Sequence, residues 1–169
     1  MKPRRHTGRD RSGILVVATL LAALAAAPAH ASGGVSCSIA ATSLAFGVYV
    51  PFSSSPTDVT ATITVSCTAT GGTTGTLSGT IGLTSTSPSY SRQLTDSAYT
   101  LRYHTYQNPA RTVFWGNGSG LGGTVAVSGS VAPGPPSLQT FTVYGRIPAR
   151  QSGAHVGDYT DVITAILNY

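Results

Sequence analysis

The clearest alternation of apolar and polar positions in the chain lies between residues 59 and 67. Valine, alanine, isoleucine and cysteine alternate there with threonine and serine, so that every second side chain is apolar. A period of two places one set of side chains on each face of an extended strand. The pattern therefore predicts a β-strand that ends its inward row on Cys67. We expect this row to be buried together with two aromatic residues: Val59, Ala61, Ile63, Val65, Trp115 and Phe141.

Weaker runs of the same kind recur along the chain and are separated by turn residues. A mixed run occupies residues 37–50, and strand-like runs occupy residues 77–83, 99–106, 125–131, 138–147 and 159–169. Residues 85–97 are polar and predict a loop, and no segment after residue 31 has the periodicity of an amphipathic helix. About seven strands at this spacing predict an all-β fold, an antiparallel β-sandwich that forms a single domain.

The run at residues 159–169 is the last strand that the pattern predicts. Its apolar positions are Ile163, Ala165, Leu167 and Tyr169, and no later strand is predicted beside it. A sheet that finishes in this way has an edge of unpaired backbone groups, to which another polypeptide can add a strand. We therefore expect the open edge to carry the function.

The first 31 residues have the features of a secretory signal peptide. Five basic residues precede an apolar run of 14 residues, Ile14 to Ala27, and Ala29–His30–Ala31 has the small residues of a cleavage site. The apolar run is too short to span a membrane. Cleavage after Ala31 leaves residues 32–169 as the mature domain.

Charge gives little support for a nucleic-acid or membrane-surface partner. The whole chain has a formal charge of +5, but half of its ten basic residues lie in the predicted leader. Residues 32–169 contain five arginines, four aspartates, no lysine and no glutamate, which leaves a net charge of +1. A nearly neutral domain lacks the basic surface that phosphate-binding proteins use.

The two cysteines, Cys37 and Cys67, predict one disulfide bond. An even number of cysteines in an exported protein favours pairing, since disulfides persist in oxidising compartments. Closing a loop of this length contributes about 3–4 kcal/mol of stability in the chain-entropy model. A redox or metal role is the alternative, but the chain has no Cys-x-x-Cys motif and no histidine beside either cysteine.

Nothing in the sequence indicates an enzyme, a cofactor or a metal site. The histidines His104 and His155 are not tied by a motif to a particular serine, and the G-x-S-x-G nucleophile elbow is absent from the sequence. His155, Asp158 and Asp161 are spaced three apart, which could place ligands near one loop, but a polar loop that begins a strand is the favoured explanation.

Two further groups of residues allow a binding role as well as a structural one. Asn117–Gly118–Ser119 matches the glycosylation sequon, but an Asn-Gly turn explains it better. Five aromatic residues suit either a sugar-binding or surface-binding patch or ordinary packing between strands: Tyr99, Tyr103, Tyr106, Phe114 and Trp115.

Several segments together resemble the spore coat protein U domain. Residues 37–49 and 59–67 resemble its front half, and residues 101–106 and 110–116 resemble its middle. The most specific part is the block YGRIPA…GDYxD, which begins at Tyr144 and is followed by Tyr169. The resemblance covers nearly all of residues 32–169, in order.

The resemblance implies a structural subunit of an archaic chaperone–usher pilus, a secreted fibre used in adhesion and biofilm. The implied fold is an immunoglobulin-like sandwich that lacks its last strand. A periplasmic pilus chaperone lends a strand, an outer-membrane usher exports the subunit, and another pilus subunit later replaces the lent strand. The expected location is the periplasm in transit and then the cell surface or fimbrium. The alternatives are a non-polymerising surface or spore-coat-like protein, and a secreted enzyme.

On this basis we expect the last strand to bind the chaperone or donor strand through Ile163, Ala165, Leu167 and Tyr169. The chain departs from the family before its first cysteine. Cleavage after Ala31 leaves only five residues ahead of Cys37, which span about 17 Å, whereas a full donor strand spans about 30 Å. We therefore expect a minor or tip-proximal subunit, which accepts a strand but does not donate one.

Overall fold

The structure is a computed structural model that describes residues 34–85, 91–119 and 122–169. All of these residues belong to one unit, Ala31–Tyr169. The predicted signal peptide at residues 1–31, with its cleavage site, lies outside the described residues.

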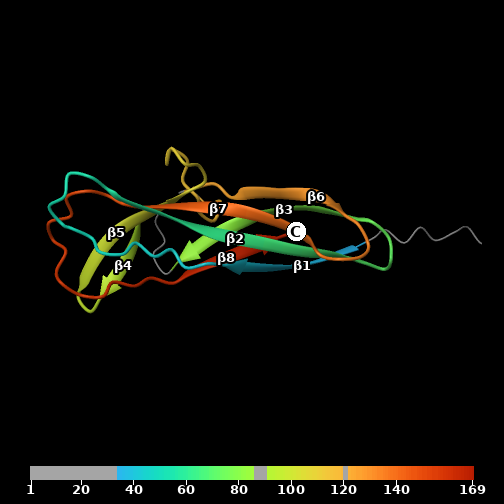
Figure 1. The fold of residues 1–169 in the computed structure, drawn as a ribbon, viewed down its shortest axis with the longest axis horizontal. Coiled ribbons are helices and arrows are strands. Elements are labelled where there is room, and N and C mark those ends of the chain that lie inside the picture. The colour runs from blue at the N-terminus through green and yellow to red at the C-terminus, as the bar shows by residue number, and fades with distance from the viewer. Residues whose placement is uncertain (1–33, 86–90, 120–121) are drawn as a thin grey trace, which may run out of the picture. The chain divides into compact units, whose positions relative to one another are not determined.

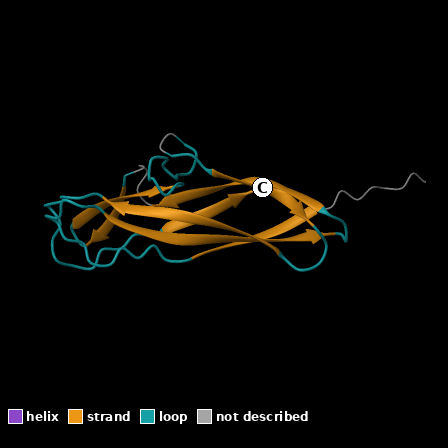
Figure 2. Ribbon diagram, turned by 45° about the horizontal axis from the view of Figure 1, so that its top comes forward, coloured by secondary structure: helices purple, strands orange, loops and turns teal. Residues whose placement is uncertain are grey.

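The described residues form strands and loops without a helix (Figure 2). The strands are β1 (Gly34–Ala41), β2 (Thr57–Thr70), β3 (Gly75–Ser85), β4 (Arg92–Asp96), β5 (Tyr99–Tyr106), β6 (Val125–Val131), β7 (Ser137–Ile147) and β8 (Ile163–Asn168). The prediction of an all-β sandwich is confirmed, with eight strands in place of about seven.

Two antiparallel sheets make up the sandwich (Figure 1). The larger sheet has the order β1-β2-β7-β5-β4, and the smaller sheet has the order β6-β3-β8. Strands β2 and β7 form the longest pairing, from Thr57 opposite Ile147 to Cys67 opposite Ser137. Because each sheet is open, β1 and β4 are edge strands of one sheet and β6 and β8 are edge strands of the other.

The core lies between the middle strands of the two sheets. Ile63 and Val65 on β2 are each 1% exposed, and Ile81 on β3 is fully buried. Trp115 is 2% exposed, and its indole N–H donates a hydrogen bond of 2.9 Å to the carbonyl oxygen of Ile81. These contacts confirm most of the predicted inward row.

Two members of that row, Val59 and Phe141, are only partly buried, so the prediction was wrong for them. The reason is the width of the smaller sheet. Three strands face five, so the smaller sheet does not cover every inward position of the larger one.

The first strand ends at Ala41 and not near residue 50 as predicted. Leu44 and Phe46 lie in the loop after β1, and both point beneath Gly145 of β7. A Cβ atom at Gly145 would lie 2.8 Å from Leu44 Cδ2 and 3.0 Å from Phe46 Cζ. The missing Cβ thus lets two loop side chains fill this part of the sandwich, and their spacing imitates a strand.

The predicted loop at residues 85–97 contains β4, which pairs with β5. The most buried residue of β4 is Arg92, which is 4% exposed and shares the inward face with Leu94, so the strand shows no clear apolar alternation. Its guanidinium donates to the carbonyl oxygen of Leu83 at 2.9 Å and to Thr105 Oγ1 at 3.2 Å. Burial lowers the pKa of Arg92, and these hydrogen bonds compensate part of the cost of burying the charge.

The last strand is shorter than the predicted run of residues 159–169. Residues 159–162 form a connection, in which Thr160 makes two backbone hydrogen bonds with Thr95 of β4, at 2.8 and 3.0 Å. Strand β8 begins at Ile163 and pairs with β3 from Ser85 to Thr80.

Candidate functional site

Strands β1 and β8 are the edges of different sheets and lie beside each other. β1 is hydrogen-bonded to β2, and β8 to β3, with no second partner strand for either among the described residues. Cys37 of β1 contacts Tyr169 just after β8, while Ala41 of β1 lines the same cavity as Ile163. The two edges therefore run in opposite directions, as the arrows in Figure 1 show.

The inward side chains of these two edges are half-buried, unlike those of the middle strands. On β1 they are Val35, Cys37 and Ile39, and on β8 they are Ile163, Ala165 and Leu167. All six pack against the buried core on one side. Their other side stays partly exposed, so the two rows form the walls of an apolar groove, called here the β1–β8 groove.

The groove opens into a cavity of about 460 Å³ beyond Ala41 and Ile163. The loop after β1 lines one side through Thr42 and Leu44, and the connection before β8 lines the other through Thr160 and Asp161. Its floor is mostly apolar, with Ile63, Leu83 and Val143 among its residues. The cavity can therefore take a large apolar side chain at this end of the groove.

One polar pair fixes the wall of this cavity. Tyr103 is 1% exposed, and its hydroxyl donates a hydrogen bond of 2.6 Å to Asp161 Oδ2. Burial, followed by the hydrogen bond to Asp161, raises the pKa of Tyr103 well above its ordinary value, so the phenol stays neutral. Asp161 Oδ1 also accepts the backbone N–H of Val162 at 2.8 Å. The pair thereby anchors the residues that lead into β8.

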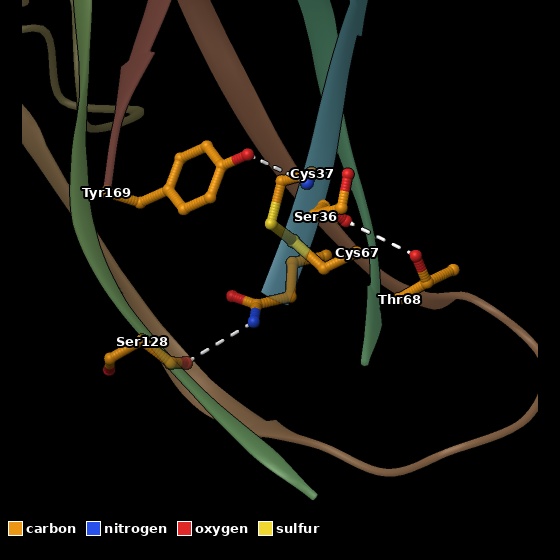
Figure 3. The surroundings of a disulfide bond; sticks show 7 residues. Ser36, Cys37, Cys67, Thr68, Ser128 and Tyr169 are labelled. Atoms are coloured by element: carbon orange, nitrogen blue, oxygen red, sulfur yellow. Dashed lines mark hydrogen bonds between the residues drawn. A yellow bond between two sulfur atoms is a disulfide. The ribbon is translucent and has the colours of Figure 1, made fainter. Parts of the chain in front are cut away.

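The predicted disulfide between Cys37 and Cys67 is present and joins β1 to β2, with the two Cα atoms 4.1 Å apart (Figure 3). The two cysteines are directly opposite each other in the antiparallel pairing. Such a close pair is one whose backbone groups point away from the partner strand. The N–H of Cys37 accordingly points to the groove, and the disulfide clamps the wall that carries it.

The four residues predicted to bind a strand do not form a single row. Ile163, Ala165 and Leu167 face the groove from β8. Tyr169 lies after the strand and points across to β1, where its hydroxyl accepts a hydrogen bond of 3.0 Å from the Cys37 N–H (Figure 3). It is 56% exposed. Their binding role remains a prediction.

The β1 wall of the groove was not predicted from the sequence. Val35 and Ile39 belong to it, yet only Ile39 fell within the first predicted run. The disulfide was a partial signal, because it places the first strand beside the second, whereas the edge position of the first strand follows from the strand order of the folded sheet.

Two of the residues considered for a metal site, His155 and Asp161, contact different partners. His155 stacks on Tyr99 with ring centroids 3.8 Å apart, and Asp161 is hydrogen-bonded to Tyr103. In residues 34–85, 91–119 and 122–169, no group of three His, Cys, Asp or Glu side chains is arranged to hold a metal ion.

The aromatic residues considered for a binding patch do not share one surface. Trp115, Tyr103 and Tyr106 are buried, whereas Tyr99 is exposed. Asn117 of the sequon forms a local turn, in which its side-chain oxygen accepts the N–H of Ser119 at 3.0 Å. The groove is therefore the feature of the described structure that sets this domain apart from a closed sandwich.

One protein family matches most of the chain. Within the described part of the chain, no helix has the length and hydropathy needed to cross a membrane. No curated protein sequence matches the chain. The sequence profile of the Spore Coat Protein U domain matches residues 21–166, which include seven of the eight strands and most of β8. The chain therefore belongs to the Spore Coat Protein U domain family, a family of structural proteins of secreted pili, fimbriae or spore-coat-like surfaces.

Proposed function

We propose that this protein is a structural subunit of a secreted chaperone–usher fibre, and that its β1–β8 groove accepts a β-strand from another protein chain. One observation carries the proposal. The apolar rows of β1 and β8 face each other half-buried, while the corresponding rows of β2 and β3 are buried. A strand with apolar side chains at alternate positions would cover both rows.

The geometry of the edges supports a strand as the occupant. Both edges have backbone groups directed toward the groove at every second residue, which an added strand can satisfy by hydrogen bonding. Because β1 and β8 run in opposite directions, an inserted strand is antiparallel to one and parallel to the other. Each apolar side chain that it buries fully contributes about 1.5–3 kcal/mol, which together with the backbone hydrogen bonds offsets the entropic cost of association.

The partners follow from this function. A periplasmic pilus chaperone supplies the first strand, an outer-membrane usher directs export, and other pilus subunits replace the chaperone in the fibre. The predicted leader and the Cys37–Cys67 disulfide support this route, because a disulfide forms readily in the oxidising periplasm. The protein passes through the periplasm and ends at the cell surface, in a fimbrium that serves adhesion and biofilm.

The proposal is tested with a synthetic ten-residue peptide in which valine and threonine alternate, flanked by lysines. The peptide should raise the melting temperature of the purified protein, whereas a peptide of the same composition without the alternation should not. Leu167→Asp, on the groove side of β8, should abolish the effect, because it places a charge in the apolar groove. Thr164→Asp is the matched control, since Thr164 is exposed on the opposite face of the same strand. The proposal is contradicted if the alternating peptide leaves the melting temperature of the wild-type protein unchanged. It is also contradicted if the peptide shifts the melting temperatures of Leu167→Asp and Thr164→Asp equally.

The position of β1 bears on the place of the subunit in the fibre. Gly34, Val35 and Ser36 already pair with Thr70, Ala69 and Thr68 of β2. Cleavage after Ala31 would leave only Ser32 and Gly33 ahead of β1, which is too short to fill a neighbour's groove. We propose a subunit that accepts a strand without donating one, and thus a minor or tip-proximal position.

The same pairing of residues 34–36 favours a second candidate, a surface or spore-coat-like protein that does not polymerise. Both candidates predict that the purified protein forms no SDS-resistant, heat-labile ladder when it is concentrated alone. Binding of the alternating peptide separates them, because only a fibre subunit needs an accepting groove. A ladder formed by the protein alone would overturn both and indicate a major, self-polymerising subunit.

A further inference from the structure

Tyr169 lies at the disulfide end of the β1–β8 groove and crosses from one wall to the other. Tyr169 directly follows the last residue of β8, and its hydroxyl is 3.0 Å from the backbone nitrogen of Cys37 on β1. Figure 3 shows the ring directed from β8 to the cysteine. We propose that Tyr169 sets the boundary of the groove at this end, so that an incoming strand pairs along β8 only as far as Leu167. This inference rests on the proposed strand-accepting function.

A glycine on β3 holds Tyr169 in this place. Gly79 belongs to the inward row of β3 that also contains Leu77 and Ile81. A Cβ atom at Gly79 would overlap the carbonyl oxygen of Asn168 and lie 2.9 Å from Tyr169 Cβ. The chain after β8 therefore turns inward over Gly79, into space that a side chain would otherwise fill. The backbone of Tyr169 is fixed by packing, in addition to the hydrogen bond of its hydroxyl.

The hydroxyl of Tyr169 accepts a hydrogen bond from a backbone N–H of β1 that an added strand would need. In the β1–β2 pairing, the backbone groups of every second residue point away from β2, and Cys37 is one of these residues. Ile39 and Ala41 follow it with the same orientation. A strand that enters from the cavity end meets Ala41 and Ile39 first and then reaches the Cys37 N–H, which Tyr169 already binds.

The length of the occupant follows from these limits. Ile163 to Leu167 spans five residues of β8, about 17 Å at 3.3 Å per residue, and the cavity lined by Ala41, Ile163 and Ala165 leaves room for residues that precede this span. The groove therefore accommodates at least five residues of an incoming strand, and peptides of six and eight residues bracket its length. A longer strand gains nothing unless the ring of Tyr169 is removed from its path.

The experiment measures the affinity of the purified protein for alternating valine–threonine peptides of six, eight, ten and twelve residues. In the wild-type protein, lengthening the peptide from eight to twelve residues should change Kd by less than about twofold. In Tyr169→Ala the same lengthening should tighten Kd about tenfold, the effect of one or two further net backbone hydrogen bonds. Tyr99→Ala is the matched control, because it removes an exposed tyrosine from β5, and it should behave as wild type.

The outcomes separate this inference from the proposed function. If no peptide of any length binds the wild-type protein or Tyr169→Ala, the groove does not accept a strand and both proposals fail. If peptides bind but both proteins show the same dependence on length, the groove accepts a strand and the boundary role of Tyr169 is wrong. A gain with length in Tyr169→Ala alone supports the boundary. Thermal unfolding of each variant establishes that it is folded.

Discussion

Replacing Gly79 with alanine tests the packing that directs the chain from β8 across the groove. The new methyl group would overlap the carbonyl oxygen of Asn168 and come within 2.9 Å of Tyr169 Cβ. The first of these atoms belongs to the backbone, so a side-chain rotation does not relieve the overlap. The end of β8 has to move away from β3.

Three contributions set the size of the effect. Overpacking of this kind costs about 1–3 kcal/mol. Displacing Tyr169 also removes its exposed hydrogen bond to Cys37, a loss of about 0.5–1 kcal/mol. Alanine reduces the entropy of the unfolded chain and restores about 0.4–1 kcal/mol. The unfolding free energy should therefore fall by about 1–3 kcal/mol.

The assay is thermal unfolding of Gly79→Ala beside Gly153→Ala. A domain of this size loses about 4 °C in melting temperature for each kcal/mol, so Gly79→Ala should melt roughly 4–12 °C below wild type. Gly153 has open space where a Cβ atom would be, so its replacement should change the unfolding free energy by less than about 0.5 kcal/mol. Equal melting of Gly79→Ala and wild type would refute the argument, as would an equal loss in both variants.

Three further predictions concern the core and its polar contacts. Ile63→Ala removes a side chain that is 1% exposed and should lower the unfolding free energy by about 2–5 kcal/mol in urea denaturation, and a loss below 1 kcal/mol would show that the site is not core. Tyr103→Phe removes the hydrogen bond to Asp161 and should lower the unfolding free energy by about 1.5–3 kcal/mol in the same assay. An unchanged unfolding free energy would show that this bond does not stabilise the fold. The hydrogen bonds from Arg146 hold the pKa of Asp58 below its ordinary value, so this stabilisation is present above about pH 4 and is lost as pH falls through the lowered pKa. Asp58→Asn should flatten that acid-side decline in stability, by at most about 1 kcal/mol because the pair is partly exposed, and an identical pH profile would contradict the assignment.

The sequence was sufficient for those parts of the fold in which one face of a strand is apolar. Strand β2 has that pattern, and its inward residues Ile63 and Val65 are buried as predicted. Strand β4 does not, because its most buried residue is Arg92, whose guanidinium donates hydrogen bonds to Leu83 and Thr105. Those partners come from other strands and cannot be found by local periodicity.

The candidate site was predictable on one side only. The apolar alternation of Ile163, Ala165 and Leu167 indicated one wall of the groove from the sequence alone. The position of Tyr169 was not predictable, because it depends on the missing Cβ of Gly79, which is about 90 residues away in sequence. Similarly, Leu44 and Phe46 suggested a strand because the space beneath Gly145 that receives them is a property of the packed sandwich.

Hydrogen exchange of backbone amides, measured by NMR with and without the alternating ten-residue peptide, tests the central claim most directly. The claim predicts new protection of the groove-facing amides of β1 and β8, because these groups would pair with the added strand. The other two sheet edges, β4 and β6, should exchange as they do in the protein alone. Protection that appears at β4 or β6, or binding without new protection at β1 and β8, would contradict the claim that this groove accepts a strand.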